Sequence, residues 1–225
     1  MAIAFRRKAL RHVGLLLHVM PSRLWIFCAD IGSVKAGRFG WFGAGPDGRP
    51  VPGSSIEDLA GAVAERIASG AKVALGFECP LYVPLRDDPM LLTKARAGEG
   101  NRSWSAGAGC GVLATGLVEV TWLLEQIRTK TPKAVAAYLN WKAFEASHGG
   151  LFLWEAFVSG KAKGHGHAQD AEIAVRAFQA ALPNPELSNA IAETRVLSLI
   201  GASMLRAGWS TNAHQLSEPC LVIKA

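Results

Sequence analysis

Apolar and polar residues follow one another in short blocks that predict a protein of alternating strands and helices. The first block is an apolar run over 24–29 that ends at a single acid, Asp30, breaks at Gly32 and resumes after Gly37. Its short length and bulky residues favour a strand buried on both faces, so we predict a β-hairpin over 24–43. An ionised carboxylate at the end of a buried strand needs a metal, a cation or hydrogen-bond donors.

The following blocks predict a helix between two strands. Prolines limit 49–52 to a short edge strand, and apolar residues at helical spacing over 55–69 predict an amphipathic helix with a serine N-cap. The apolar run 72–77 then ends at Glu78. A helix that leads into a buried strand is typical of a crossover onto a parallel sheet, which places Glu78 at the same end of the sheet as Asp30.

The second half of the chain predicts four more helices and two more strands. A long polar loop from Pro84 to Trp104 precedes them, and loops of this length are usually functional or disordered. The first of these elements is a long helix with a core stripe of Leu113, Leu117, Val120, Leu124 and Ile127. A helix over 134–146 and a strand over 151–157, which contains Glu155, follow it. The last elements are a helix from His167 to the stop at Pro183, a helix over 187–206 and an edge strand over 220–223.

A glycine-rich turn from Gly107 to Gly111 resembles a loop that cradles phosphate at the start of a helix. It has no strand before it, no following Lys-Ser/Thr pair and no downstream acid for a ribose. We therefore expect these glycines to serve close helix packing.

Composition indicates one well-buried domain. The chain has 225 residues, half of them hydrophobic and 19% charged. We expect 20–225 to form that single domain, with a C-terminal helix and tail. Its four cysteines include no Cys-x-x-Cys pair, which indicates neither a zinc site nor a disulfide framework. Reduced thiols favour a cytoplasmic location.

The net charge of +6 argues only weakly for a polyanionic partner. Residues 1–19 hold four basic residues and no acid, so the remainder carries +2. The basic and then apolar 1–19 could be a short targeting peptide, although it lacks a clear cleavage site and is too short to span a membrane. Met20-Pro21-Ser22 looks like a natural start, so 1–19 is either a mis-called extension or a frayed or membrane-touching helix. We expect no integral membrane segment.

Three acids fall at comparable places in the predicted order. Asp30 and Glu78 each end a strand, and Asp170 lies in the first turn of the helix that starts at His167. Asp170 shares a helix face with Ala174, so its side chain should point to the sheet. The carboxyl ends of parallel strands meet at one end of a sheet, where sites form. Carboxylates brought together there repel one another unless they share a hard cation, and Mg²⁺ or Mn²⁺ suits oxygen ligands.

Each acid also has a purely structural explanation. Asp30 could cap backbone amides in a turn. Glu78 could form an ion pair with Arg86 or Arg96, and the helix dipole favours Asp170 whatever its function. Only the joint occurrence of the three acids favours a shared site.

The order of elements and acids resembles the ribonuclease H-like fold, an α/β mixed sheet of an antiparallel hairpin plus parallel strands with helices on both faces. More narrowly, the chain is similar to the uncharacterised bacterial and archaeal family described as predicted RNase H-like nucleases, with acids placed as in Holliday-junction resolvases. The resemblance covers roughly 24–182. It is carried by Ala29-Asp30-Ile31-Gly32-Ser33, Gly37-Arg38-Phe39-Gly40-Trp41, Gly76-Phe77-Glu78-Cys79-Pro80-Leu81, Trp154-Glu155 and His167-Ala168-Gln169-Asp170-Ala171.

The resemblance implies divalent-metal-dependent cleavage of phosphodiester bonds in nucleic acid, DNA or RNA. Asp30, Glu78 and Asp170 would be the catalytic residues and the ligands of Mg²⁺ or Mn²⁺, and His167 or Glu155 would stand in for a fourth acidic ligand. Basic side chains would contact phosphates. These are Arg96, Arg102 and Lys35, extended by Arg38, Lys161 and Lys163.

Two other functions stay open. A catalytically silent binding or scaffold domain on the same fold is the stronger rival, because a fold does not establish a function. Asp-x-Gly hairpins also begin the halves of actin-like ATPases and sugar kinases, but those proteins need two such halves and this chain has one.

Overall fold

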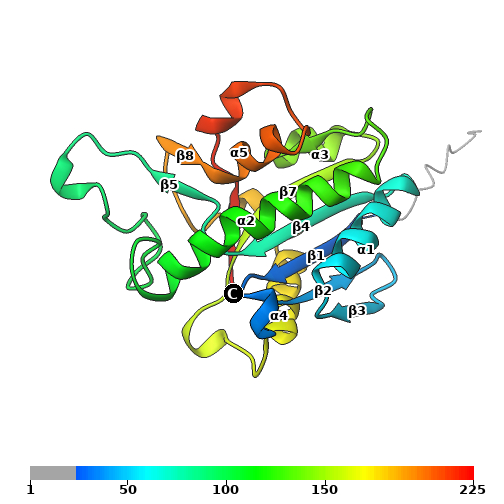
Figure 1. Ribbon diagram of the computed structural model, residues 1–225, viewed down its shortest axis with the longest axis horizontal. Coiled ribbons are helices and arrows are strands. Elements are labelled where there is room, and N and C mark those ends of the chain that lie inside the picture. The colour runs from blue at the N-terminus through cyan, green and yellow to red at the C-terminus, as the bar shows by residue number, and fades with distance from the viewer. Residues whose placement is uncertain (1–23) are drawn as a thin grey trace, which may run out of the picture.

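A mixed seven-stranded sheet forms the centre of the computed structural model, which describes residues 24–225 (Figure 1). The strands of this sheet are β1 (Leu24–Asp30), β2 (Gly40–Ala44), β3 (Pro50–Gly53), β4 (Lys72–Glu78), β6 (Ala137–Tyr138), β7 (Gly150–Phe157) and β9 (Leu221–Lys224). Their order is β3-β2-β1-β4-β7, and β6 and β9 both pair with the far side of β7. Residues 1–19 lie outside the described residues, so the interpretations of this segment stay predictions.

The direction of the strands confirms an α/β fold with an antiparallel hairpin and parallel strands. β2 is antiparallel to both β1 and β3. β4 is parallel to β1 and to β7, and β7 is parallel to β6 and β9. Because β1, β4 and β7 run in one direction, their carboxyl ends lie at one end of the sheet.

Helices cover both faces of this sheet, as predicted. They are α1 (Ile56–Ala68), α2 (Gly107–Thr129), α3 (Trp141–Ala146), α4 (His167–Ala181) and α5 (Leu199–Arg206). α1, α2 and α5 contribute to the core on one face, with α2 crossing the front of the sheet in Figure 1, and α3 and α4 contribute to the core on the other. Side chains alternate along β1, so Phe27 and Ala29 point to the α2 face whereas Ile26 and Cys28 point to the α4 face.

A second, two-stranded sheet supports the long polar loop. β5 (Tyr82–Pro84) pairs in the antiparallel direction with β8 (Val196–Ser198), and the loop that follows β5 projects to the left in Figure 1. Arg86 forms an ion pair with Glu193 at 2.6 Å, which ties the base of this loop to the segment before β8.

Two of the predicted helices are shorter than their composition suggests. Of 134–146 only α3 is helical, because Ala137 and Tyr138 pair with β7 and Asn140 caps the helix that follows. Of 187–206 only α5 is α-helical, because 196–198 pair with β5 and the 3-10 helix Pro185–Ser188 ends near the start of this range. Pairing with strands distant in sequence thus overrides local helical propensity.

The apolar stripe predicted for α2 is correct only in its C-terminal half. Val120, Leu124 and Ile127 are buried, whereas Leu117 is 45% exposed and the neighbouring Val118 is 71% exposed. Within 24–225, α2 is also the helix long and apolar enough to cross a membrane by length and composition. A buried stripe is equally typical of a core helix, so the expected lack of an integral membrane segment stays a prediction.

All four cysteines belong to the described residues. Cys28, Cys79 and Cys220 are buried, Cys110 is exposed, and each is a free thiol. The cytoplasmic location inferred from their spacing stays a prediction.

Candidate metal centre

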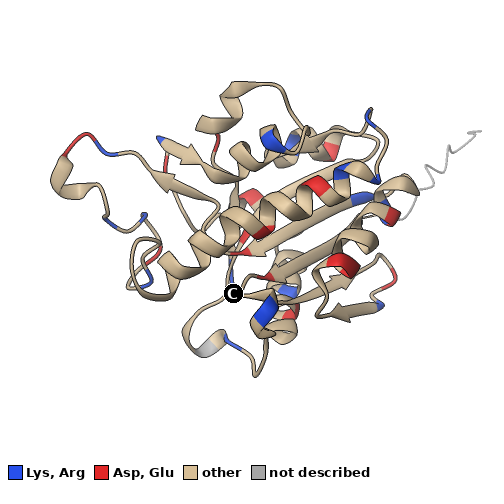
Figure 2. Cartoon of the chain, in the orientation of Figure 1, with Lys and Arg blue, Asp and Glu red and all other residues tan. Residues whose placement is uncertain are grey.

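Strand register places two of the predicted acids side by side. Asp30 is the last residue of β1, Glu78 is the last residue of β4, and the two are direct partners in the parallel pair. Partners in register point to the same face, and Cys28 and Ala74 show that this is the face covered by α4. Figure 2 shows acidic positions at the tips of both strands.

Asp170 meets these two acids from α4. It lies in the first turn of the helix and is 5% exposed, because its side chain faces the sheet as its helical position predicts. One carboxylate oxygen from each of Asp30, Glu78 and Asp170 lies within 4.8 Å of the other two. We call these three residues the acid cluster.

A glycine on the neighbouring strand lets α4 approach the sheet. Gly40 is the partner of Asp30 on β2. A Cβ at position 40 would lie 2.5 Å from the backbone nitrogen of Ala168 and 2.7 Å from the Cβ of His167, closer than side chains tolerate. Gly40 therefore sets how near Asp170 comes to Asp30.

Replacing Gly40 with Ala should push the first turn of α4 away from the sheet without touching a carboxylate. Overpacking of this kind costs about 1–3 kcal/mol, and the shift of Asp170 should weaken binding of Mn²⁺. Denaturant unfolding and Mn²⁺ titration measure the two effects. Gly61→Ala on α1, where a Cβ meets no atom within 4 Å, is the matched control. Wild-type stability and Mn²⁺ affinity in Gly40→Ala would contradict this role.

Burial makes the acid cluster an unfavourable place for negative charge. Asp30 is 5% exposed, and the side chain of Glu78 is 11% exposed. Burial raises the pKa of Asp30 above its ordinary value, although a hydrogen bond with His167 opposes the shift. Burial, together with the charge of Asp30, raises the pKa of Glu78 to about 8. The Oε2 atom of Glu78 is buried without a hydrogen-bond partner.

Donors from the segment between β7 and α4 offset part of this charge. The Lys163 Nζ lies 3.2 Å from Glu78 Oε1 and 3.2 Å from Asp170 Oδ2. The backbone amide of Gly164 donates to Asp170 Oδ1 at 2.6 Å. Lys163 and Gly164 thus contact the acid cluster directly.

His167, predicted as a supporting residue, contacts Asp30. It is the first residue of α4, and its Nδ1 lies 2.5 Å from Asp30 Oδ2, with the side chain 43% exposed. Asp30 therefore contacts a side chain of α4. His167 lies beside the three converging oxygens and orients one of them.

The donor set of the acid cluster fits a hard divalent cation. All three side chains offer carboxylate oxygens, which suit Mg²⁺ and Mn²⁺. The Glu78 Oε2 atom has no hydrogen-bond partner, whereas buried polar atoms normally have one, so the site can accept a further ligand there. The acid cluster is therefore a candidate metal centre.

In chelator, the stability of the protein should fall as the pH rises from about 4.5 to about 8. The pKa of Glu78 is higher in the folded state than its ordinary 4.5, so the folded protein keeps a proton that the unfolded chain releases. Thermal unfolding against pH measures this slope, which Glu78→Gln should flatten while raising the midpoint at pH 8. Glu145→Gln, at an exposed position on α3, should keep the wild-type profile. Identical profiles for Glu78→Gln and wild type would contradict the expectation.

Glu155 lies outside the acid cluster, which corrects its prediction as a fourth ligand. It pairs with Phe77, one residue before Glu78, and so points to the opposite face of the sheet. There Arg96 donates to both Glu155 oxygens, at 2.5 and 2.9 Å. The carboxylate is thus already neutralised.

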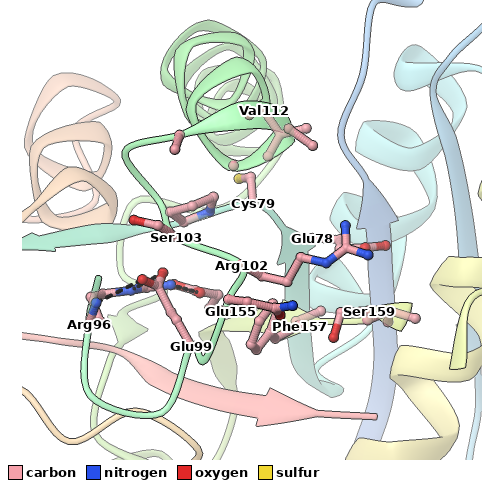
Figure 3. Close-up of a pocket in the computed structure, with 18 of the residues that line it drawn as sticks. Glu78, Cys79, Arg96, Glu99, Arg102, Ser103, Val112, Glu155, Phe157 and Ser159 are labelled. Atoms are coloured by element: carbon pink, nitrogen blue, oxygen red, sulfur yellow. Dashed lines mark hydrogen bonds and ion pairs between the residues drawn. The ribbon is translucent and has the colours of Figure 1, made fainter. Parts of the chain in front are cut away.

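Arg96 is buried in an ion network with Glu155 and Glu99, which corrects its predicted role as a phosphate contact. It is 3% exposed, and it also donates to Glu99 at 2.8 Å and to the Tyr82 carbonyl at 3.3 Å. Figure 3 shows Arg96, Glu99 and Glu155 linked at one end of a cavity. Four of the five N–H donors of Arg96 are used within this buried network, so the side chain serves the network and not a substrate phosphate. The suggested ion pair between Glu78 and Arg96 or Arg86 is wrong as well, because Glu78 pairs with Lys163.

A cavity of about 460 Å³ opens beside the acid cluster. Its lining includes Asp30, Glu78 and Lys163. Arg102, from the loop that follows β5, and the start of α2 complete this part of the lining. Figure 3 shows the Arg102 side chain extending toward Glu78. The predicted phosphate contact of Arg102 is therefore compatible with its place next to the acids.

Two of the other basic residues predicted to meet phosphate do not line this cavity. Lys35 and Arg38 are exposed in the turn after β1 and do not line it. The side chain of Lys161 lies outside the described residues. Phosphate binding by these three residues stays a prediction. In the glycine-rich turn, a Cβ at Gly109 would meet the Ser103 carbonyl of the preceding loop, whereas a Cβ at Gly107 or Gly111 would meet no atom within 4 Å. Close packing in this turn is therefore confined to Gly109, and it is against a loop and not a helix.

Two contributors to the site were missed by sequence reasoning. Gly40 has a detectable signal, since the hairpin register sets it opposite the strand-end acid Asp30. The backbone amide of Gly164 has no sequence signal apart from the glycine-rich segment around it, because any residue other than proline offers the same backbone donor. The sequence predicts Lys163 as an extension of the phosphate contacts, whereas in the structure it contacts Glu78 and Asp170.

Fold and site together define an α/β protein with three buried carboxylates at the carboxyl ends of two parallel strands and the start of a facing helix. Comparison with known protein families, with curated proteins and with solved structures finds no match. The resemblance to RNase H-like nucleases therefore stays a prediction from the sequence.

Proposed function

We propose that this protein is a divalent-metal-dependent nuclease that hydrolyses phosphodiester bonds of DNA or RNA. The observation that carries the proposal is the convergence of Asp30, Glu78 and Asp170 within 4.8 Å. Three elements separated along the chain each deliver one carboxylate to this point, at the burial cost described above. Such a cost is common at functional sites and unusual elsewhere.

The strand order gives the proposal its second support. The order β3-β2-β1-β4-β7, with β2 antiparallel to its neighbours, is compatible with the RNase H-like resemblance drawn from the sequence. The acids lie at the ends of β1 and β4 and on α4, and this placement supports the resemblance. The RNase H-like assignment is part of the proposal.

The residues of the site have distinct roles in this proposal. Asp30, Glu78 and Asp170 would hold Mg²⁺ or Mn²⁺, and His167 would orient Asp30 through the 2.5 Å contact. A bound divalent ion would activate water and stabilise the leaving oxygen of a phosphodiester. Arg102, from the loop beside the cavity, would contact the phosphate of the substrate.

Cleavage assays test the proposal. The purified protein is incubated with single-stranded, duplex, hybrid and branched nucleic acids, in Mn²⁺ or in chelator. The expected result is cleavage of at least one substrate in Mn²⁺, none in chelator and none by Asp170→Asn. No cleavage in Mn²⁺, or equal cleavage by Asp170→Asn, would contradict the nuclease proposal.

One observation favours a silent binding or scaffold domain instead. Lys163 already bridges Glu78 and Asp170, and an ammonium group that stays there would take the place of a metal. This alternative predicts that Mn²⁺ changes neither the unfolding midpoint nor any activity. The two functions thus differ in what happens to Lys163.

A further inference from the structure

Lys163 is the lysine that forms ion pairs with the acid cluster within the described residues. Its Nζ bridges Glu78 and Asp170 at 3.2 Å from each. At these distances the ammonium group of Lys163 bridges the carboxyl groups of the two residues.

This ammonium and a divalent ion exclude one another. Mg²⁺ takes oxygen ligands at about 2.0–2.1 Å, and two cations between the same carboxylates would repel each other strongly in a buried site. Glu78 and Asp170 are thus available either to Lys163 or to the ion. Binding of the ion requires the Lys163 side chain to leave.

The surroundings of Lys163 leave room for this movement. Its side chain is 45% exposed and also lines the cavity beside the acid cluster. The segment between β7 and α4 contains Gly160, Gly164 and Gly166, and a Cβ added at Gly160 or Gly166 would meet no atom within 4 Å beyond the adjoining residues. The long, flexible lysine stem can therefore swing out without moving a strand or helix.

We propose that Lys163 is a built-in competitor for the divalent ion. It holds Glu78 and Asp170 together while no ion is bound, and the ion displaces it. The inference rests on the metal centre of the proposed function and adds that Lys163 sets the ion concentration at which this centre is filled.

Lys163→Met in the full-length protein tests the competition. The variant should bind Mn²⁺ at least about tenfold more tightly than wild type, because the ion no longer displaces two charge-assisted hydrogen bonds. In chelator its unfolding midpoint should fall, because the carboxylates lose their counter-charge, and Mn²⁺ should restore it. Electron paramagnetic resonance of free Mn²⁺ and thermal unfolding measure these effects without any substrate.

Two further variants serve as controls. Lys142→Met removes an exposed lysine from α3. Because α3 comes directly before the start of β7, this lysine lies at the opposite end of the sheet from the acid cluster, and the variant should behave as wild type. Lys163→Arg keeps a positive charge and should keep the weaker binding of Mn²⁺. Tighter binding in Lys163→Arg equal to that in Lys163→Met would overturn the charge competition.

The outcomes separate this inference from the proposed function. If neither wild type nor Lys163→Met binds Mn²⁺, the metal centre fails and the competitor role fails with it. If both bind Mn²⁺ with equal affinity, or the variant binds more weakly, the metal centre stands and Lys163 is not a competitor.

A measurement on the wild-type protein covers the case in which Lys163→Met does not fold. Amine-reactive labelling followed by mass spectrometry reports the accessibility of each lysine. Saturating Mn²⁺ should increase labelling of Lys163 and leave labelling of Lys142 unchanged. Labelling of Lys163 that stays constant or falls when Mn²⁺ binds would overturn the proposal.

Discussion

Replacing Asp30 with Asn should lower metal-dependent cleavage by about 100-fold or more. A metal ion supplies several kcal/mol of transition-state stabilisation, and each 1.4 kcal/mol is a factor of about ten in rate. Asp30 is one of the three converging carboxylates and also bonds His167, so its loss affects both the ion and the start of α4. Cleavage rates in saturating Mn²⁺ measure this effect.

The same variant should show unchanged or higher stability in chelator. Burial raises the pKa of Asp30, so its ionised form opposes folding at neutral pH, and Asn removes that charge with little change of shape. Thermal unfolding in chelator checks this point. Asp47→Asn, at an exposed turn between β2 and β3, is the matched control for both measurements. A large fall in stability in chelator, with cleavage intact in Mn²⁺, would make Asp30 a structural residue.

Replacing Arg96 with Met should destabilise the protein by about 3–5 kcal/mol, because removing one partner of a buried ion pair leaves the other charge uncompensated. Arg96 is 3% exposed and neutralises both Glu155 and Glu99. Adding Glu155→Gln to Arg96→Met should recover part of the loss. Denaturant unfolding measures these free energies.

The control for this prediction is an exposed ion pair at the base of the same loop. Arg195 pairs with Asp87, and the two side chains are 59% and 85% exposed. Pairs of this kind contribute little to stability, so Arg195→Met should unfold close to wild type. A loss in Arg96→Met as small as that in Arg195→Met would contradict the network's structural role.

The central elements of the fold could be predicted because each has its own local pattern. Apolar runs that end at Asp30 and Glu78 predict β1 and β4, and helical spacing after His167 predicts the buried face of α4. The convergence of Asp30, Glu78 and Asp170 follows from these patterns and from the common direction of parallel strands. This part of the site is therefore readable from the sequence.

The predictions are wrong where a residue's place depends on strands or side chains that are distant in sequence. A difference of one residue in register sends Glu155 to the opposite face from Glu78, and a sequence gives no register between β4 and β7. Arg96 has the same residue type whether it meets a phosphate or a buried carboxylate. The helix predicted over 187–206 begins only at α5, because residues 196–198 form a strand that pairs with β5, more than 100 residues earlier in the chain.

The most direct test of the metal centre is a crystal structure of the protein soaked in Mn²⁺, with diffraction collected at the manganese absorption edge. We expect an anomalous peak among the carboxylates of Asp30, Glu78 and Asp170, with the Lys163 ammonium moved away from Glu78 and Asp170. Well-ordered carboxylates with no anomalous peak between them in saturating Mn²⁺, and Lys163 still in place, would contradict it.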